Sequence, residues 1–530
     1  INTNVTVDSS TTVEGTNSAK QYIAIAQRNN SSGTLAGRYI VNNGTISLAG
    51  NGSTGIAGDY ITVTNSSTGK IKLSGNNSIG MYVANGADTL NQGLIELGGQ
   101  GSVGIYGGNY FDGSTSYTTL GYANDQIDIE NQKDIKTVAG GVSGDAFGIY
   151  ADNNTTAVSS VNLTSTSNID LKGTGTIIGA YLKKTDLINA GTITVESAAG
   201  GSSVGIYGDN STATSIAGSV NVSGGSGTGI YLKNSTMSSG AAIKVADVTS
   251  GIGMYVEATA GNTSLGTNTN TISLGDNVTG MYAVGASTLN TGTIINTGTI
   301  QSLAASADKA IGMYIGAHGS GVNAGNIRLT AIGTDKDQVG VYNHSGTFSM
   351  GSGNIEVYSQ NGAGLYAKAG TVNNLSGGII KTGSGAIGLY ADNGATIQLS
   401  GTYKSVVDNG GIFALNNGSG NINIPVGNNI VVDVEAGGMA FSSTGALNTY
   451  LSSLVTGGGT LEVNLKDPTS KLAILDTPGT ILLSSLGAAY APGATITPQV
   501  KISSSSNPNY TPFSITKGTL IVDQAVSLNN

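Results

Sequence analysis

Four aromatic side chains lie close together at one place in a chain that has few aromatic residues. Tyr110, Phe111, Tyr117 and Tyr122 fall within 13 residues, although Phe, Trp and Tyr together make up only 5% of the sequence. Aromatic rings on surface loops stack on sugar faces and fill pockets of partner proteins. We therefore interpret this segment as a protruding loop and as the candidate ligand-binding site. The alternative is a small hairpin that packs its own rings onto the body of the protein.

Four acidic residues, Asp125, Asp128, Glu130 and Asp134, follow this cluster. Asp128 and Glu130 are two residues apart, so on a strand they share one face, as the general acid and base of a glycosidase could. No Arg or His lies close by to mark a substrate, and acids are common on protein surfaces. We interpret the group as solvated acids rather than as a catalytic or calcium-binding site. The calcium-binding repeat Gly-Gly-x-Gly-x-Asp is absent from the sequence.

Other catalytic or metal-binding patterns have little support. His318 and His344 are the two histidines, there is no cysteine, and neither histidine belongs to a nucleophile motif. Similar positions on adjacent repeats would allow a weak two-histidine metal site, but we interpret both as polar surface residues. The phosphate-binding pattern Gly-x-x-x-x-Gly-Lys-Ser/Thr does not occur. We expect no catalytic residue, no metal ion and no cofactor.

The composition excludes several classes of protein. With 22 Lys and Arg against 31 Asp and Glu, the net charge of −9 gives no basic surface for a nucleic acid. The 83 glycines in 530 residues disfavour long helices, and a charged fraction of 10% is too low for charge-driven disorder. The most apolar stretch, residues 477–497, is interrupted by Pro478 and Pro492. We therefore predict no transmembrane segment in this sequence.

A Gly-x-Tyr motif recurs periodically. The shortest interval between successive tyrosines is 24 residues, and the longest, 44 residues, contains the aromatic cluster. A period of this length is typical of a solenoid in which each repeat forms one coil and longer repeats carry loop insertions. The series comprises Tyr82, Tyr106, Tyr150, Tyr181, Tyr207, Tyr231, Tyr255, Tyr282, Tyr314, Tyr342, Tyr366 and Tyr390, followed by a phenylalanine version at Phe413.

Aliphatic–polar–aliphatic triplets precede most of the tyrosines. This alternation of β-branched residues predicts short strands whose outer two side chains are buried and whose middle side chain faces solvent. Asn-x-Gly motifs predict corners, because Asn and Gly tolerate left-handed backbone conformations. The triplets include Ile71-Lys72-Leu73, Ile95-Glu96-Leu97, Val220-Asn221-Val222, Ile243-Lys244-Val245, Ile327-Arg328-Leu329 and Ile355-Glu356-Val357, and the corner motifs begin at Asn91, Asn189, Asn290, Asn296 and Asn323.

These patterns predict an all-β protein. Strands that recur every 24 residues without an intervening helix stack in parallel, so we predict a right-handed parallel β-helix, a solenoid of about 24 residues per coil with two or three strands in each. Stacking places Lys72 beside Glu96 and Arg328 beside Glu356. If the alternation holds, the tyrosines form an external ladder along a groove of glycines.

The composition changes towards the end of the chain. All seven prolines lie beyond Phe413, and the periodic Gly-x-Tyr series ends there. We predict that residues 1–420 form the regular parallel β-helix with Gly-x-Tyr repeats. Residues 421–530 then form a proline-containing β region of irregular coils or a cap, which would cover the unpaired backbone groups of the last coil.

The repeats also resemble a known family. Gly251-Ile252-Gly253-Met254-Tyr255 and Ile311-Gly312-Met313-Tyr314, interspersed with Asn-Thr-Gly-Thr-Ile, are similar to the passenger repeats of large fusobacterial type V autotransporter adhesins, of the arginine-inhibitable or galactose-sensitive type. The likeness spans roughly residues 35–415. It implies a passenger displayed outside the cell on a β-helical stalk, with the signal peptide and the outer-membrane translocator barrel elsewhere in the parent chain.

The family resemblance implies adhesion rather than catalysis. The expected partners are host-cell glycans, including galactose-containing sugars, host surface receptors, and partner bacteria. We therefore expect a non-enzymatic, extracellular adhesin passenger whose loops bind these ligands, with no binding residue carried over from the family. A polysaccharide-degrading β-helix enzyme that uses Asp128 and Glu130 is one alternative. A ligand-free stalk or self-association module is the other.

Overall fold

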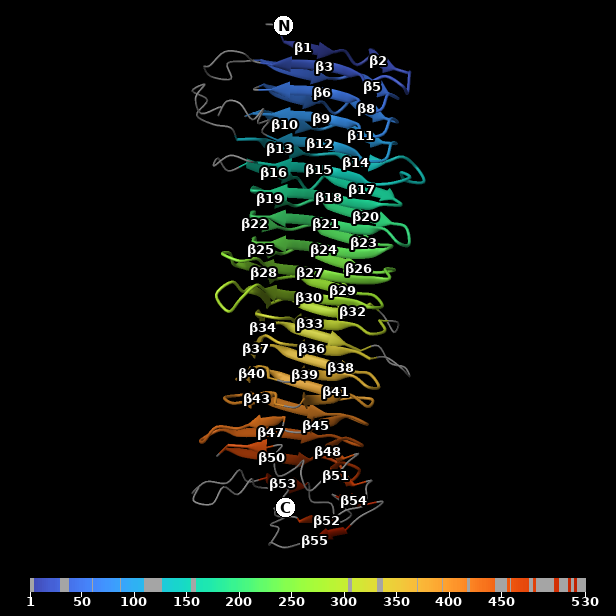
Figure 1. Cartoon of the computed structure of the whole chain (residues 1–530). Coiled ribbons are helices and arrows are strands. Elements are labelled where there is room, and N and C mark those ends of the chain that lie inside the picture. Colours follow the sequence, from blue (N-terminus) through green and yellow to red (C-terminus); the bar gives the residue numbers. More distant parts are fainter. Residues whose placement is uncertain are drawn as a thin grey trace. The chain divides into compact units, whose positions relative to one another are not determined.

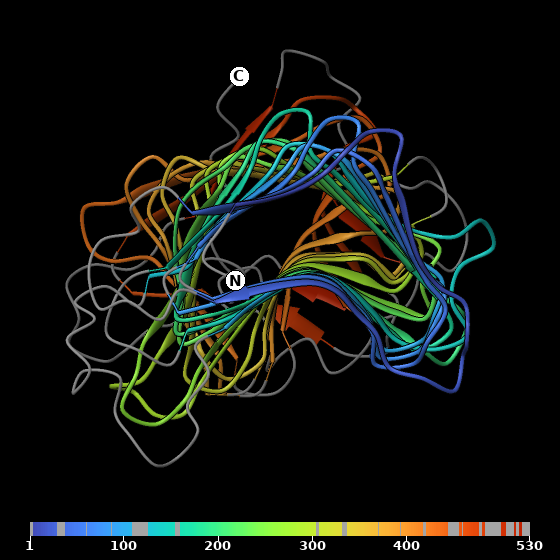
Figure 2. The same ribbon diagram turned by 90° about the horizontal axis from the view of Figure 1, so that it is seen from above.

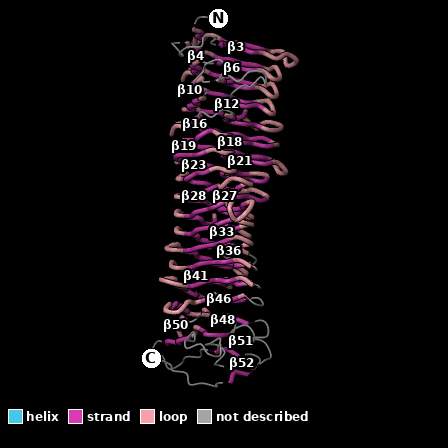
Figure 3. Tube along the Cα trace, turned by 60° about the vertical axis from the view of Figure 1, so that its left-hand side comes forward, coloured by secondary structure: helices cyan, strands magenta, loops and turns pink. Residues whose placement is uncertain are grey.

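The computed structural model of the chain describes most of its residues. The described ranges are 4–28, 38–59, 61–85, 87–108, 126–153, 159–303, 307–330, 337–368, 370–392, 394–416, 420–443, 455–457, 459–475, 480–482, 500–504, 513–515 and 519–521. The chain divides into two compact units, residues 1–256 with 264–266 (unit 1) and residues 257–263 with 267–530 (unit 2). Within the described ranges all regular elements are strands, joined by loops (Figure 3).

Unit 1 is a parallel β-solenoid with three strands in each coil, so that every third strand along the chain joins the same sheet (Figure 1). Sheet A contains β1 (Val5–Val7), β4 (Tyr39–Asn42), β7 (Thr62–Asn65), β10 (Asp88–Asn91), β13 (Asp128–Asn131), β16 (Ser159–Leu163), β19 (Thr185–Asn189), β22 (Thr212–Ile216) and β25 (Thr236–Ser239). Sheet B contains β2 (Thr12–Gly15), β5 (Thr45–Leu48), β8 (Lys70–Leu73), β11 (Leu94–Leu97), β14 (Asp134–Thr137), β17 (Asn168–Gly173), β20 (Thr192–Ser197), β23 (Ser219–Ser223) and β26 (Ala242–Val245). Sheet C contains β3 (Ile23–Arg28), β6 (Thr54–Asp59), β9 (Ile79–Ala84), β12 (Ser102–Gly108), β15 (Ala146–Asp152), β18 (Thr176–Lys183), β21 (Ser202–Asp209), β24 (Ser226–Lys233) and β27 (Ser250–Ala258), of which the last crosses the unit boundary.

Unit 2 has the same three-sheet plan. Its sheet A strands are β28 (Ser264–Asn268), which also crosses the boundary, β31 (Gly292–Asn296), β34 (Gly319–Asn323), β37 (Thr347–Met350), β40 (Val372–Leu375), β43 (Thr396–Leu399), β46 (Asn421–Asn423) and β49 (Val455–Thr456). Its sheet B strands are β29 (Thr271–Leu274), β32 (Thr299–Ser302), β35 (Asn326–Leu329), β38 (Asn354–Tyr358), β41 (Ile379–Gly383), β44 (Lys404–Val407), β47 (Asn429–Val434), β50 (Thr460–Leu465) and β53 (Val500–Ser504). Its sheet C strands are β30 (Val278–Gly285), β33 (Ile311–Ile315), β36 (Val339–Asn343), β39 (Ala363–Ala367), β42 (Ile387–Ala391), β45 (Ile412–Asn416), β48 (Met439–Ser443), β51 (Lys471–Leu475) and β54 (Phe513–Ile515), and β52 (Thr480–Leu482) pairs separately with β55 (Thr519–Ile521).

The strand register confirms the all-β parallel solenoid predicted from the repeats. Tyr82 pairs with Tyr106, 24 residues later, and Tyr106 pairs with Tyr150, so the 44-residue interval is one coil with an insertion. Lys72 lies opposite Glu96 across β8 and β11. Insertions therefore leave the stack intact because they are accommodated between strands.

The coil has three sides, one for each sheet (Figure 2). The core of each unit lies inside the coil and is built from aliphatic side chains of all three sheets. Ile71 and Leu73 are buried and Lys72 between them is exposed, and the other predicted triplets show the same alternation. In unit 1, Ile71 of sheet B is fully buried together with Val63 of sheet A and Met81 of sheet C. Burying each such side chain contributes about 1.5–3 kcal/mol.

The Asn-x-Gly motifs form corners, but not by the predicted backbone conformation. Asn91 ends β10 and β11 follows, which places the turn correctly, yet neither Asn91 nor Gly93 has a positive φ. Instead the Asn91 side chain is fully buried, accepts a hydrogen bond from Asn65 Nδ2 at 2.8 Å and donates one to Asn131 Oδ1 at 2.6 Å. Glycine is needed because a Cβ at Gly93 would lie 2.2 Å from the carbonyl oxygen of Gly69.

Beyond residue 420 the described strands continue the parallel pairing, as β43 pairs with β46 and β47 with β50. The division into two compact units falls at residues 257–267 of the sequence. The division of the chain into residues 1–420 and 421–530 by repeat type stays a prediction.

Candidate binding face

The tyrosine-bearing strands of sheet C are bent at the glycine that precedes each tyrosine. In β9, Gly80 and Met81 are both buried, and Tyr82 is half-buried between Met81 and Val83. A Cβ at Gly80 would lie 2.5 Å from the carbonyl oxygen of Gly104 and 2.9 Å from Ile95 Cγ2. The glycines of Gly-x-Tyr therefore face the core, which corrects the prediction of a glycine groove beneath the rings. The bend turns each tyrosine side chain to the outer face.

The tyrosines form two ladders of contacting rings, one in each unit. The rings are stacked in unit 1, whereas in unit 2 the ring of Tyr342 is tilted by 43° against Tyr314 and by 42° against Tyr366. In unit 1 the centroid distance falls to 4.4 Å between Tyr150 and Tyr181 and is 5.4 Å between Tyr82 and Tyr106. Each stacked pair contributes about 0.5–1.5 kcal/mol beyond its buried area. The unit 1 ladder contains Tyr82, Tyr106, Tyr150, Tyr181, Tyr207, Tyr231 and Tyr255, and the unit 2 ladder contains Tyr282, Tyr314, Tyr342, Tyr366 and Tyr390.

Burial in the ladder changes the ionisation of two of the phenols. Burial, with smaller contributions from Tyr181 and Asp152, raises the pKa of Tyr150 to about 12. In unit 2, burial and the neighbouring tyrosines raise the pKa of Tyr314 to about 12. Because burial and a nearby phenolate both disfavour ionisation, Tyr150 and Tyr314 stay neutral to higher pH than a free tyrosine.

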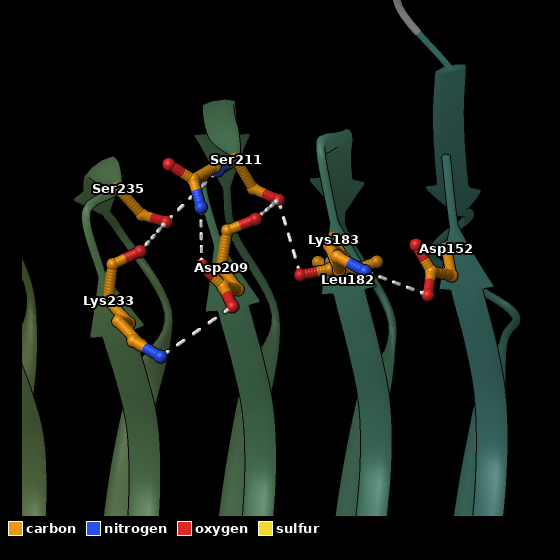
Figure 4. Close-up of polar contacts among 8 residues, drawn as sticks. Asp152, Leu182, Lys183, Asp209, Ser211, Lys233 and Ser235 are labelled. Carbon is orange, nitrogen blue, oxygen red and sulfur yellow. Dashed lines mark hydrogen bonds and ion pairs between the residues drawn. The ribbon is translucent and has the colours of Figure 1, made fainter. Parts of the chain in front are cut away.

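A column of alternating charges runs beside the unit 1 ladder, two residues after the tyrosines. Asp152 and Lys183 form an ion pair at 3.1 Å, and Asp209 and Lys233 form another at 4.0 Å, on four successive strands (Figure 4). The side chains are 16–35% exposed, so they lie on the same outer face as the rings. Next to this column, Ser211 Oγ accepts a hydrogen bond from the Thr185 backbone N–H and donates one to the carbonyl oxygen of Leu182.

The predicted aromatic loop falls between the strands β12 and β13 in the sequence. Tyr110, Phe111, Tyr117 and Tyr122 themselves lie outside the described residues. Their flanks are described, since β12 ends at Gly108 and the chain is described again from Gln126, just before β13. The segment, residues 109–125, therefore lies between a sheet C strand and a sheet A strand in the sequence and starts three residues after Tyr106.

The predicted acids occupy the neighbouring sheet. Asp125 lies outside the described residues, whereas Asp128 and Glu130 are both half-buried on the outer face of β13. Gln126 Nε2 and Ser160 Oγ donate hydrogen bonds to Asp128, and Gln132 Nε2 donates one to Glu130. Asp134 lies on β14 of sheet B, on a different side of the coil.

Sequence reasoning missed one residue of this group, Asp88, which lies directly opposite Asp128 in the register of β10 and β13. Burial and the charge of Asp128 raise the pKa of Asp88. The 40-residue separation hid the pair in the sequence, although counting back one coil from Asp128 with the insertion removed would have found it.

The two histidines do not form a pair. His318 is exposed in the turn between β33 and β34, with a φ of 52°. His344 instead packs at the ladder, with its ring centroid 6.0 Å from those of Tyr314 and Tyr342, and its Nε2 lies 3.3 Å from Lys368 Nζ. Among the described residues no group of three or more His, Asp or Glu side chains is placed to hold a metal ion.

Comparison of the chain with protein-family models, with curated proteins and with solved structures finds no match. The described part of the chain has no helix of sufficient length and apolar character to cross a membrane.

Proposed function

We propose that this chain is part of a cell-surface adhesin, a type V autotransporter passenger of the fusobacterial kind, that attaches a bacterium to host cells or to partner bacteria. The proposal makes the solenoid an extracellular stalk and its loops the binding elements for glycans or surface receptors. It assigns no enzymatic activity to the chain.

The observation that carries the proposal is the place of the aromatic segment in the sequence, between two strands of the stack. Gly108 and Gln126, which flank it, belong to one coil whose strands β12 and β13 keep their register with the coils on both sides. The strands on either side of these 17 residues thus keep the register of the stack. Rigid scaffolds that carry variable loops are a common arrangement for recognition.

Binding by the purified chain to a glycan array and to host cells tests the proposal. We compare the unaltered chain with a variant in which residues 109–122 are replaced by a short Gly-Ser turn. The matched control replaces residues 259–263, which join β27 to β28 at the same kind of sheet C to sheet A corner but carry no aromatic ring. We expect binding to be lost only in the first variant, with circular dichroism unchanged. Equal binding by all three proteins would contradict the assignment of the loop.

A second candidate function rests on the carboxylates Asp88 and Asp128. Paired carboxylates of which one has a raised pKa resemble the acid and base of a glycosidase, which would make the chain a polysaccharide-degrading enzyme. Release of reducing sugar that is lost in an Asp88→Asn, Asp128→Asn double variant, and kept in Asp134→Asn, would support it. No release from any pectic or host polysaccharide would count against it.

A further inference from the structure

The outer face of sheet C in unit 1 carries three parallel columns of side chains. The middle column is the tyrosine ladder. Three residues before the tyrosines is an apolar column, interrupted by Thr228 before Tyr231. Two residues after the four tyrosines from Tyr150 to Tyr231 is the charged column. The apolar column contains Ile79, Val103, Phe147, Ile178 and Val204, of which Ile178 is buried, and the charged column contains Asp152, Lys183, Asp209 and Lys233.

The tyrosine ladder and the apolar column together make a large apolar surface that is only partly buried. Ile79 and Val103 are half-buried, as are the tyrosines beside them, whereas the outer positions of sheet B carry Lys72 and Glu96. The six sheet C strands from β12 to β27, at ~4.8 Å each, and six residues of each strand, at ~3.3 Å each, give a face of about 29 by 20 Å, roughly 600 Å². Two such faces bury about 1,200 Å², the lower limit for a specific protein interface.

We propose that this face binds a second copy of the chain, in antiparallel orientation, about a two-fold axis that lies in the face and is perpendicular to the columns. The tyrosine ladders and the apolar columns of the two copies then pack on each other. This inference concerns a different surface from the aromatic loop and does not depend on the adhesin proposal.

Symmetry and charge select the antiparallel arrangement. The perpendicular axis places each column over its own counterpart with the order reversed. Lys183 then faces the partner subunit's Asp209, and Asp152 faces the partner subunit's Lys233, so every contact joins opposite charges. A two-fold axis along the columns would instead place the charged column over the apolar column and leave buried charges without partners, which is costly.

The intramolecular ion pairs are compatible with this contact. Lys183 Nζ lies 3.1 Å from Asp152 Oδ2, which uses one of the three hydrogen-bond donors of the ammonium group. The Asp209 and Lys233 pair is longer, at 4.0 Å. Each charge can therefore keep its neighbour along the column and add one across the interface.

Sedimentation velocity over a range of concentrations tests the proposal. We expect a monomer–dimer equilibrium that Lys183→Asp weakens at least about tenfold, because it places like charges opposite each other twice in a symmetric dimer. Phe147→Ser should weaken it as well, through the apolar column. The matched control is Lys172→Asp, which breaks a cross-coil ion pair of 2.6 Å on sheet B and should leave the equilibrium within about twofold. Circular dichroism establishes that each variant is folded.

Cross-linking tests the orientation, because the chain has no cysteine of its own. Asp152→Cys and Lys233→Cys proteins are mixed and treated with a bismaleimide that spans about 10 Å, the distance between packed sheets. We expect a cross-linked dimer from the mixture and little from either protein alone. A chain that stays monomeric at about 100 μM, a dimer that Lys183→Asp and Phe147→Ser leave unchanged, or cross-linking of Asp152→Cys to itself at the level of the mixture would each overturn the proposal.

Discussion

The ring of Tyr358 lies across Gly383 on the next coil of unit 2. The two residues are paired in the register of β38 and β41, and a Cβ at Gly383 would lie 2.6 Å from Tyr358 Cε1. The Tyr358 hydroxyl donates a hydrogen bond to Asp408 Oδ2, beyond the glycine. The arrangement that the sequence suggested for the ladder tyrosines, a ring that covers bare backbone, thus occurs at a tyrosine outside the ladder.

Gly383→Ala should therefore lower the stability of unit 2. The added methyl group must displace the Tyr358 ring or the Asp408 side chain, and overpacking of this kind costs about 1–3 kcal/mol. We expect a lower midpoint of thermal unfolding. Gly351→Ala is the control, because a Cβ there meets no atom within 4 Å and should change the midpoint little. Equal unfolding midpoints for the two variants would show that the Tyr358 ring moves aside without a loss of stability.

Asn91→Ala should destabilise unit 1 more than its small change in volume suggests. Asn91 has no exposed surface and joins Asn65 to Asn131 by hydrogen bonds, so its removal leaves a buried amide donor and a buried carbonyl acceptor without their partner. Each such group costs about 1–3 kcal/mol. Urea unfolding followed by circular dichroism measures the loss. Asn162→Ala, at a half-exposed outer position of β16, is the control and should cost under about 0.5 kcal/mol. A comparable loss in both would argue against the buried amide ladder.

The ladder tyrosines should make the protein lose stability at high pH. Tyr150 and Tyr314 have a pKa of about 12 in the folded chain, against about 10 for an unperturbed tyrosine. A pKa raised by folding stabilises the folded state below pH 10, and this contribution is lost as the pH rises from about 10 to 12. Phenolate absorbance should accordingly show a group of tyrosines that titrate late in the folded chain and at the ordinary pH in urea. Identical titrations in both states would refute this effect of burial.

The contribution of Asp433 to the stability of the folded state should be lost at low pH. Burial by itself would raise the pKa of this carboxyl group, but Lys404 Nζ at 2.5 Å, Asn464 Nδ2 at 2.9 Å and Lys466 Nζ at 3.5 Å hold it below the usual value. A lowered pKa stabilises the folded state above the ordinary pKa, near 4, and that contribution disappears as the pH falls through the folded value.

Asp433→Asn should therefore unfold at a lower temperature at pH 7 and differ less from the unaltered chain at pH 2. The matched control is Asp170→Asn, an exposed position of β17. If the difference between the Asp433 variant and the unaltered chain were the same at both pH values, the ion pairs would not be its cause.

The sequence period was sufficient to predict the fold because each coil repeats the same pattern of buried and exposed residues. The alternation in Ile71-Lys72-Leu73 specifies a strand with two buried positions, and a 24-residue interval places it beside Ile95-Glu96-Leu97 in parallel. The stacking also predicted an individual ion pair correctly, because Arg328 Nε lies 2.9 Å from Glu356 Oε2. Local pattern and register are enough when every contact is with the neighbouring coil.

Other features depend on how one coil packs against the next. Gly80 faces the core because the strand bends there and brings its backbone against Gly104 and Ile95. Asn91 forms its corner through a ladder of side-chain hydrogen bonds and not through a left-handed turn. The pairing of Asp88 with Asp128 was hidden by the inserted loop. Composition and spacing determined the solenoid and its repeat, whereas the outer columns, the buried amides and the paired carboxylates were decided by tertiary structure, because they arise from distances between coils that the order of residues does not contain.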